Sequence, residues 1–388
     1  MKPHPRFADA STTIFEEMSG LARQTGAINL GQGFPESAGP LALRQAAAKA
    51  AVEGWNQYAP SRGTPELRAA VVEHYNRFHG ADLDTDRVLV TSGATEALAA
   101  SLMAWVKEGD EVIIFEPAYD AYRPLIERAG GVVRAVQLSP PHWRLEEEAL
   151  RAAITPATRV VLFNNPMNPA SRVFDAKELS VLARVCVEHD LVAISDEVWE
   201  HVVFDGREHL PLALVEGMNE RTIKIGSAGK MFGLTGWKIG FVCAEPNLIE
   251  PVAKAHQFIT FATPPMLQIA VAEGLAWERP YFDAMQAELE ASRDCLKRAL
   301  EQAGYVCLDS QGAYFLSVDL AASGISIGDV DFCNRIVRDF GVAAIPVSAF
   351  VSGSGQGAVV RFCFAKPDEV LIEAAKRLGE ARRALISV

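Results

Sequence analysis

Short apolar runs alternate with longer amphipathic stretches through the middle of the chain, and this alternation constrains the fold more than any other feature. Many runs are apolar at consecutive positions, which is typical of strands buried on both faces of a largely parallel sheet. The stretches between them repeat apolar residues three and four positions apart, as amphipathic helices do. The predicted strands are residues 88–91, 112–115, 132–136, 159–163, 191–195, 222–225 and 239–243, and the predicted helices are 95–107, 118–129 and 176–189. This order predicts an α/β domain, which we place at residues 42–275.

The pattern changes after Pro280. A long amphipathic helix is predicted over residues 281–303, and strands and helices then follow in mixed order. The later predicted elements are strands at 305–308, 314–318, 343–345 and 359–364, a helix at 329–340 and a last helix after Pro367. We therefore expect a smaller α+β domain made of residues 1–41 and 276–388.

Composition excludes several classes of function. The chain has 49 acidic and 37 basic residues, for a formal net charge of −12, and such a field repels nucleic-acid phosphates and anionic lipid surfaces. No apolar run approaches the roughly 18 residues needed to cross a bilayer, and residues 1–6 lack the apolar stretch of a secretion signal. The 6 cysteines form no C-x-x-C pair, and His74 and His79 are wrongly spaced for two metal ligands on one helix face. We expect a cytoplasmic protein with no metal site.

One segment points to a particular chemistry. Residues 227–238, Ser-Ala-Gly-Lys-Met-Phe-Gly-Leu-Thr-Gly-Trp-Lys, follow a predicted strand and surround Lys230 with small residues that would let a planar group approach. Lysine amines form Schiff bases with carbonyl compounds, of which pyridoxal phosphate is a common cofactor. That cofactor also requires a carboxylate beside its ring nitrogen, an anion-binding turn and donors at its phenolic oxygen.

Two other segments supply groups of these kinds. Asp196 ends a predicted buried strand, and the carboxyl edge of a parallel sheet is where sites are built, although a helix cap or loop ion pair would also place an aspartate there. Residues 91–96, Thr-Ser-Gly-Ala-Thr-Glu, pass from strand to helix, whose first N–H groups attract a phosphate. An ordinary N-cap, with Glu96 complementing the helix dipole, is the alternative.

These segments, in this order, make the chain resemble the class I/II pyridoxal-phosphate aminotransferases of fold type I, and within them the kynurenine, glutamine and methionine aminotransferase branch. The resemblance runs from about residue 14 to the end. It implies a large domain with a mostly parallel seven-stranded sheet and a smaller α+β domain. The matching stretches are residues 29–35 (Asn-Leu-Gly-Gln-Gly-Phe-Pro), 56–58 (Asn-Gln-Tyr), 91–98, 110–117, 168–169 (Asn-Pro), 195–198 (Ser-Asp-Glu-Val), 226–230 with 236–238, and 342–347 with 360–364.

The resemblance implies a role for each cofactor-binding position. Lys230 resembles the Schiff-base lysine and proton carrier, Asp196 the partner of the pyridinium nitrogen and Asn168 the donor to the phenolic oxygen. The remaining implied cofactor contacts are the phosphate-binding group Gly93, Ala94, Thr95, Ser227 and Lys238, and the ring-stacking Tyr119. Lys238 falls where many relatives have arginine, so a point charge replaces a two-pronged donor.

The resemblance also implies how substrate and partner subunit are bound. Arg361 resembles the arginine that binds the substrate carboxylate, because a guanidinium matches a carboxylate with two hydrogen bonds. A strand-edge ion pair is the alternative, but the apolar neighbours of Arg361 predict a desolvated position. Gly33 and Asn168 would contact the same carboxylate. Tyr58 resembles the tyrosine that reaches the partner's phosphate site, which implies a homodimer.

The chain departs from the family pattern at two positions. Trp199 stands where the usual Asp-Glu-Val-Tyr has its tyrosine, and an indole N–H can donate but cannot accept. We expect Trp199 either to replace the tyrosine as donor to the phenolic oxygen or to turn away. Ser171 stands where relatives have glycine, so it must adopt the backbone conformation that a glycine adopts.

The implied activity is ping-pong transamination between an L-amino acid and a 2-oxo acid, as part of amino-acid metabolism. Apolar residues around Ile14, Phe15 and Met18, with Phe34 and Phe261, favour a neutral, bulky donor such as methionine, glutamine, an aromatic residue or kynurenine; the same residues could instead only pack the small domain. Succinyl-diaminopimelate is an alternative substrate. A carbon–sulfur β-lyase and a cofactor-binding regulator are alternative functions, although the chain has no basic recognition segment for DNA.

Overall fold

A computed structural model of the chain describes residues 12–353 and 357–386. Its centre is a seven-stranded sheet, which confirms all seven strands predicted between residues 88 and 243. All the strands run parallel except β8, which is antiparallel to both of its neighbours. In sheet order the strands are β2 (Val88–Thr91), β8 (Gly240–Cys243), β7 (Thr222–Ser227), β6 (Val192–Asp196), β5 (Thr158–Asn164), β3 (Glu111–Glu116) and β4 (Val132–Gln137).

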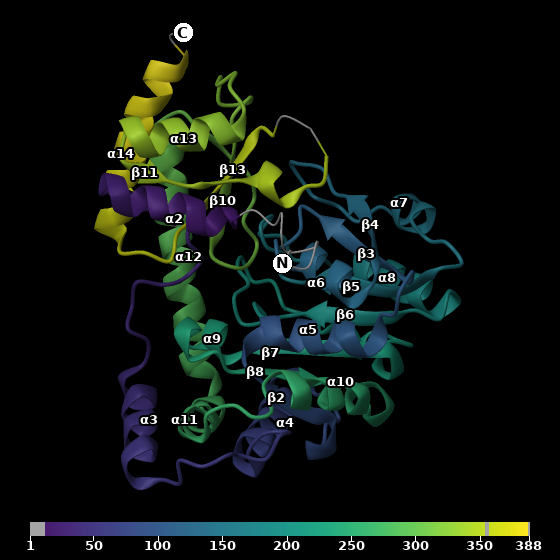
Figure 1. Cartoon of the computed structure of the whole chain (residues 1–388). Coiled ribbons are helices and arrows are strands. Elements are labelled where there is room, and N and C mark those ends of the chain that lie inside the picture. The colour runs from purple at the N-terminus through teal and green to yellow at the C-terminus, as the bar shows by residue number, and fades with distance from the viewer. Residues whose placement is uncertain (1–11, 354–356, 387–388) are drawn as a thin grey trace, which may run out of the picture.

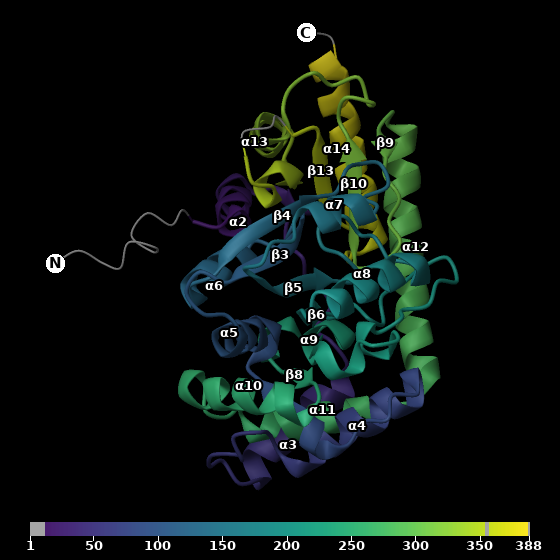
Figure 2. The ribbon, with the colours of Figure 1, turned by 90° about the vertical axis from the view of Figure 1, so that its right-hand side faces the viewer.

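Helices cover both faces of this sheet because successive strand residues point to opposite sides. In β3, Val112 and Ile114 pack against α5 (Gly93–Trp105), α6 (Tyr122–Ala129) and α10 (Pro246–Ile259). Ile113 and Phe115 pack on the other face with α7 (Glu147–Ala152) and α8 (Ala176–Glu188). Figure 2 shows α5 and α10 on one side of the sheet and α8 on the other.

One predicted helix starts later than expected. Residues 118–129 were predicted as a single helix, but α6 begins at Tyr122. The reason is that Ala118 donates its backbone N–H to the carbonyl of Phe350, 2.8 Å away, so residues 118–121 form a turn after β3. This turn carries Tyr119 at the sheet edge.

A third group of helices packs around the β2 and β8 end of the sheet (Figure 1). These are α3 (Leu41–Glu53), α4 (Pro65–His79), α9 (Ala228–Met231) and α11 (Pro265–Leu275). Helix α9 is a single turn that directly follows β7, and it holds Lys230 at the edge of the sheet.

The remaining elements form a second layered unit. Its four-stranded antiparallel sheet has the order β12 (Ile345–Pro346), β13 (Val359–Cys363), β10 (Phe315–Asp319) and β9 (Val306–Cys307), and a separate parallel pair joins β1 (Ile28–Asn29) to β11 (Val342–Ala343). The expected single strand at 343–345 is therefore two strands, because β11 and β12 pair with different partners. Its helices are α2 (Ile14–Thr25), α12 (Arg279–Gln302), α13 (Asp329–Asp339) and α14 (Asp368–Ile386).

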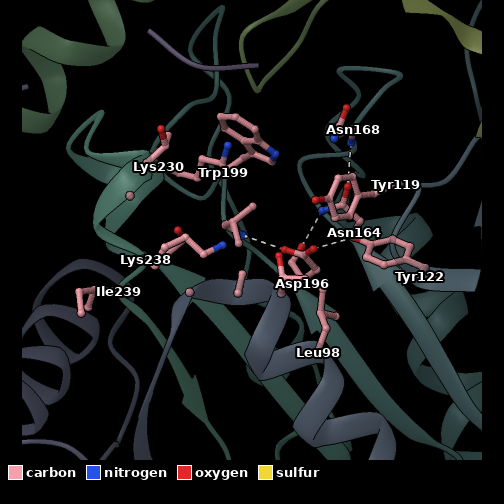
Figure 3. Close-up of a pocket in the computed structure, with 17 residues that line it drawn as sticks. Leu98, Tyr119, Tyr122, Asn164, Asn168, Asp196, Trp199, Lys230, Lys238 and Ile239 are labelled. Atoms are coloured by element: carbon pink, nitrogen blue, oxygen red, sulfur yellow. Dashed lines mark hydrogen bonds between the residues drawn. The ribbon is translucent and has the colours of Figure 1, made fainter. Parts of the chain in front are cut away.

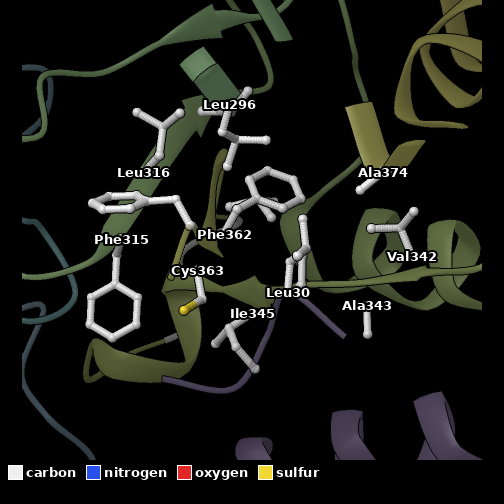
Figure 4. Close-up of a cluster of buried hydrophobic side chains, with 14 of the residues drawn as sticks. Leu30, Leu296, Phe315, Leu316, Val342, Ala343, Ile345, Phe362, Cys363 and Ala374 are labelled. Atoms are coloured by element: carbon white, nitrogen blue, oxygen red, sulfur yellow. The ribbon is translucent and has the colours of Figure 1, made fainter. Parts of the chain in front are cut away.

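The second unit has its own hydrophobic core, part of which Figure 4 shows. Leu30 from the N-terminal segment packs there with Phe362 and Leu296 from the C-terminal part. The two parts of the chain thus share one core. The division into residues 42–275 and residues 1–41 with 276–388 stays a prediction, and this packing supports it.

The carboxyl ends of the parallel strands meet at one edge of the large sheet. Asn164 ends β5 and lies opposite Asp196 at the end of β6, and Ser227 ends β7. In open α/β sheets this edge is where ligands bind. Among the described helices, none is long and apolar enough to cross a membrane.

Candidate active site

A cavity of about 210 Å³ opens at this edge of the sheet (Figure 3). Ten of the predicted site residues line it: Gly93, Ala94, Thr95, Tyr119, Asn168, Asp196, Trp199, Ser227, Lys230 and Lys238. Residues that the sequence did not single out complete the lining: Leu98, Tyr122, Asn164, Val198, Gly229, Thr235 and Ile239. Segments between residues 93 and 239 thus meet around one hollow, as the predicted site requires.

Lys230 presents its amine between three groups. Its Nζ lies 3.2 Å from the Tyr314 hydroxyl, 3.4 Å from the carbonyl oxygen of Gly33 and 4.6 Å from the centre of the Trp199 ring. Burial lowers the pKa of Lys230 from 10.5 to about 8, although Asp196 and Cys363 favour the charged form. At neutral to mildly alkaline pH a substantial part of this amine is therefore uncharged and nucleophilic.

Asp196 holds its carboxylate at the floor of the cavity. Its Oδ2 accepts a hydrogen bond from the Tyr122 hydroxyl at 2.6 Å, and its Oδ1 accepts a longer one from the Val198 backbone N–H at 3.4 Å. Burial raises the pKa of Asp196 to about 6, and the Tyr122 hydrogen bond opposes this shift. The group is thus mainly ionised at pH 7.

A chain of hydrogen bonds joins Asp196 to Arg361. Asn164 donates from Nδ2 to the Asp196 carbonyl at 2.8 Å and accepts the Asn168 backbone N–H at 2.7 Å. Oδ1 of Asn168 in turn accepts a hydrogen bond from Nη1 of Arg361 at 2.7 Å.

The loop that carries Asn168 has the expected glycine-like conformation at Ser171, with φ +54°. The Ser171 hydroxyl donates to the Phe315 carbonyl at 2.7 Å, which anchors the loop on β10.

Arg361 is fully buried on β13, the second strand of the smaller sheet. Its Nη2 donates to the Gly31 carbonyl at 2.8 Å, and the guanidinium lies 3.9 Å from the centre of the Phe315 ring. Nε has no hydrogen-bond partner, and no carboxylate among the described residues is within ion-pair distance. Burial lowers the pKa of Arg361 to about 10. The described residues thus form no strand-edge ion pair with Arg361, and Asp120 favours the charged guanidinium only from beyond ion-pair distance.

Two backbone features of the strand-to-helix turn at Gly93 require glycine. Gly93 has φ +74°, which favours glycine. A side chain at Gly240 on β8 would place its Cβ 2.7 Å from the Gly93 carbonyl carbon, so only glycine allows β8 to pass this turn. Gly93, Ala94 and Thr95 at the start of α5 line the cavity together with Ser227 and the exposed Lys238.

The Trp199 ring faces into the cavity (Figure 3). It is buried and packs edge-on against Tyr314, with ring centres 4.2 Å apart. Of the two expected arrangements, the one in which Trp199 turns away is therefore not found. Its indole N–H makes no hydrogen bond within the part of the chain that the structure describes, so this donor is free to serve a ligand.

Besides Arg361, two other predicted positions lie outside the lining. Tyr58 is 87% exposed and contacts only the edge of the Phe261 ring among the aromatic side chains described. Gly33 instead lies beside the amine of Lys230, and its carbonyl also accepts the Tyr314 hydroxyl at 2.6 Å. A Cβ at Gly33 would lie 2.8 Å from the Phe315 ring, so this close approach needs glycine.

Comparison with known proteins identifies the family to which the chain belongs. The profile of the family "Aminotransferase class I and II" matches residues 25–378. The chain belongs to this family. It is 44% identical to a probable N-succinyldiaminopimelate aminotransferase of Mycobacterium tuberculosis (96% of this chain, 97% of the relative) and 38% identical to the methionine aminotransferase of Escherichia coli (97% and 98%). The structure of the Mycobacterium tuberculosis N-succinyldiaminopimelate aminotransferase superposes with a TM-score of 0.95 at 43% identity, over 98% of this chain and all of that one.

Class I and II aminotransferases depend on pyridoxal phosphate, whose ring, when bound, delocalises the electron pair left by removal of the substrate α-proton. The predicted cofactor, the enzyme class and fold type I are therefore confirmed. The cavity of this aminotransferase fits the group chemically, since it offers an amine with a lowered pKa, a buried carboxylate, a helix N-terminus and a free indole donor.

The aminotransferase site also contains three residues that sequence reasoning missed: Tyr122, Asn164 and Tyr314. Asn164 could have been found, because it directly follows the strand predicted at residues 159–163, as Asp196 follows the strand predicted at 191–195. A nearby buried cluster was not anticipated either. Glu197, Glu200 and His209 lie close enough together to hold a metal ion. However, Lys224 Nζ lies 2.8 Å from Glu200 Oε2 and 3.6 Å from Glu197 Oε2, so this cluster already contains a cation.

Proposed function

We propose that this aminotransferase binds the α-carboxylate of an L-amino acid on Arg361, with Asn168 and the backbone at Gly33 beside it. The observation that carries the proposal is the buried guanidinium of Arg361, which has an unpartnered Nε and no carboxylate within ion-pair distance among the described residues, since Asp120 acts on it only from farther away. A carboxylate there would supply the missing charge and accept two parallel hydrogen bonds.

The other site residues take the roles that the resemblance implies. Lys230 would take the proton from the substrate α-carbon and return it to the carbon that was the cofactor's aldehyde, and its lowered pKa suits a group that must both accept and donate near neutral pH. Asp196 supports the ring nitrogen with its negative charge. Asn168 and Trp199 donate to the phenolic oxygen, and Tyr119 stacks on the ring. Ser227, Lys238 and the turn Gly93, Ala94 and Thr95 bind the phosphate.

We propose a neutral, bulky amino acid as the donor. Phe15 supports this, because its ring centre lies 5.2 Å from the Arg361 guanidinium and 5.6 Å from the Phe350 ring, which makes an apolar wall beside the carboxylate site. Met18, which we expected to share this wall, is buried in the core of the small unit. N-succinyldiaminopimelate is the second candidate, because the Mycobacterium tuberculosis relative named for it is 44% identical over nearly the whole chain.

The half-reactions test these substrates directly. Purified protein supplied with pyridoxal phosphate should show a yellow absorbance band that bleaches with its true donor and returns with a 2-oxo acid. Methionine, glutamine, kynurenine, phenylalanine and N-succinyl-LL-2,6-diaminopimelate should be compared by the rate of bleaching at equal concentration. Fastest bleaching by the succinylated compound would overturn the neutral-donor proposal, and pyruvate and ammonia from cysteine conjugates would reveal β-lyase activity.

We also propose that the working unit is a homodimer in which Tyr58 reaches the partner's phosphate site. Supporting this, large apolar side chains are exposed around it, with Val52 85%, Trp55 81% and Phe258 85% accessible. Sedimentation should give twice the chain mass of 42.0 kDa. Mixing inactive Lys230→Ala and Tyr58→Ala chains should restore activity, because the mixed dimer has one intact site. A monomer, or a mixture without activity, would contradict the arrangement.

A cytoplasmic location stays a prediction.

A further inference from the structure

We propose that Tyr122 is a positioning residue for Asp196: its hydroxyl fixes one carboxylate oxygen, so that the other is directed to the ring nitrogen of pyridoxal phosphate. This inference rests on the proposed role of Asp196. Tyr122 was not among the residues that the sequence singled out.

The geometry separates the two carboxylate oxygens. The Tyr122 hydroxyl donates to Oδ2 of Asp196 at 2.6 Å, and both side chains are buried, so the bond is protected from competing water. Oδ1 has only the 3.4 Å contact with the Val198 N–H. Figure 3 shows Tyr122 beside Asp196 at the end of the cavity farthest from Lys230. Oδ1 is therefore the oxygen with acceptor capacity left for a ligand.

Tyr122 is held in place independently of the carboxylate. It begins α6, whose Ile126 is fully buried in the core beneath the sheet. Its ring packs edge-on against that of Tyr119 at 5.6 Å. Removing only the hydroxyl therefore leaves the ring, its core contacts and the support of Tyr119 in place.

The hydroxyl also acts on the charge of Asp196. Burial raises the pKa of Tyr122 well above its usual value, so it stays a donor across the working range. The titratable groups facing Asp196 are Lys230, which favours its ionised form, Glu197, which disfavours it, and the tyrosines 119 and 122. Burial and Glu197 both raise the pKa of Asp196, and the Tyr122 hydrogen bond lowers it. Without that hydrogen bond the pKa of Asp196 should rise above about 6, so a higher pH is needed to ionise the carboxylate.

The chain offers a matched control in Tyr75. Its hydroxyl donates to Oε1 of Glu200 at 2.6 Å, and both groups are buried, as at Tyr122 and Asp196. Neither Tyr75 nor Glu200 lines the cavity. Tyr75→Phe and Tyr122→Phe each remove a hydrogen bond to a buried carboxylate, but only one of the two carboxylates faces the cofactor site. The Tyr75 hydroxyl also accepts a hydrogen bond from Lys224 Nζ at 2.7 Å, so the control removes one hydrogen bond more than Tyr122→Phe does.

The test measures the affinity of the apoenzyme for pyridoxal phosphate between pH 5 and pH 9, by quenching of protein fluorescence. In wild type the affinity should fall below about pH 6, as Asp196 takes up a proton. In Tyr122→Phe the midpoint should move to higher pH and the affinity at pH 7 should fall roughly 10-fold or more, the usual worth of a hydrogen bond to a charged group. Tyr75→Phe should keep the wild-type profile.

Two further variants make the outcome decisive. Asp196→Asn should weaken binding and remove the midpoint near pH 6. If it does so while Tyr122→Phe keeps the wild-type profile, the positioning role is wrong and the proposed function stands. If Asp196→Asn also changes nothing, the proposed role of Asp196 itself fails. Should Tyr122→Phe not fold, 3-fluorotyrosine at position 122 keeps the ring and gives a more acidic donor, so the midpoint should move to lower pH; an unmoved midpoint overturns the proposal.

Discussion

Lys230→Ala is expected to lower transamination by up to about 10⁴-fold, since one acid–base group contributes up to about that factor and no other amine among the described residues is placed to replace it. Among the residues that the structure describes, Lys238 is the only other lysine that lines the cavity, and it lies at the Gly93 turn, where its Nζ would be 3.2 Å from a Cβ on that glycine. Pyridoxal phosphate should still associate with the variant through the remaining cofactor contacts, but without the yellow band of the attached cofactor.

The amine's lowered pKa gives this prediction a second readout. A lysine attacks only when uncharged, so the rate of cofactor attachment to wild-type apoenzyme should rise with pH and level off above about pH 8 instead of near its ordinary 10.5. Stopped-flow absorbance after mixing with pyridoxal phosphate measures this rate. Lys254→Ala, at an exposed lysine of α10, is the control and should match wild type in both rate and turnover. Turnover of Lys230→Ala near the wild-type rate, without added amines, would contradict the assignment of Lys230.

Sequence reasoning succeeded where residues near each other in the chain decide the structure. Strands buried on both faces must be apolar at consecutive positions, so β3 and β5 were visible as uninterrupted apolar runs. Asp196 and Ser227 were placed correctly at the sheet edge because a parallel sheet brings the ends of its strands together. The start of α6 could not be predicted in the same way, since it depends on a backbone hydrogen bond between Ala118 and Phe350.

What the sequence could not supply is the pairing of polar groups across the fold. Tyr122 and Asp196 are 74 residues apart, and their hydrogen bond depends on how α6 sits on the sheet. The Tyr314 hydroxyl reaches Gly33 across 281 residues, and Arg361 reaches Gly31 across 330. A tyrosine in an amphipathic stretch is read as a core residue until its neighbour is known. The family resemblance identified Arg361 because residues 360–364 match a family motif. Tyr314 lies outside every matching stretch, so the resemblance did not identify it.

Arg361→Lys is expected to lower kcat/KM for every amino acid by roughly 10- to 100-fold, because it removes one of two hydrogen bonds to a charged carboxylate, each worth about 1.5–3 kcal/mol. The lysine would keep the positive charge but could not bond the substrate while also reaching Asn168 and the Gly31 carbonyl, as the guanidinium does. The loss should appear mainly as a raised KM, and the bound cofactor's absorbance should stay unchanged, since Arg361 does not line the cofactor cavity.

Arg293→Lys separates this effect from simple loss of stability. Arg293 is also buried, bonds a carbonyl and lies over an aromatic ring, at 4.9 Å from the centre of Phe204, but it sits on α12 with Asp205 as its ion-pair partner. Both variants should lower the melting temperature, because both replace a buried planar cation, and only Arg361→Lys should raise KM. A carboxylate-free amine substrate analogue makes the comparison sharper, since its slow reaction should be equally fast in wild type and Arg361→Lys. Equal KM values for amino acids in all three proteins would show that the guanidinium is structural and that the carboxylate binds elsewhere.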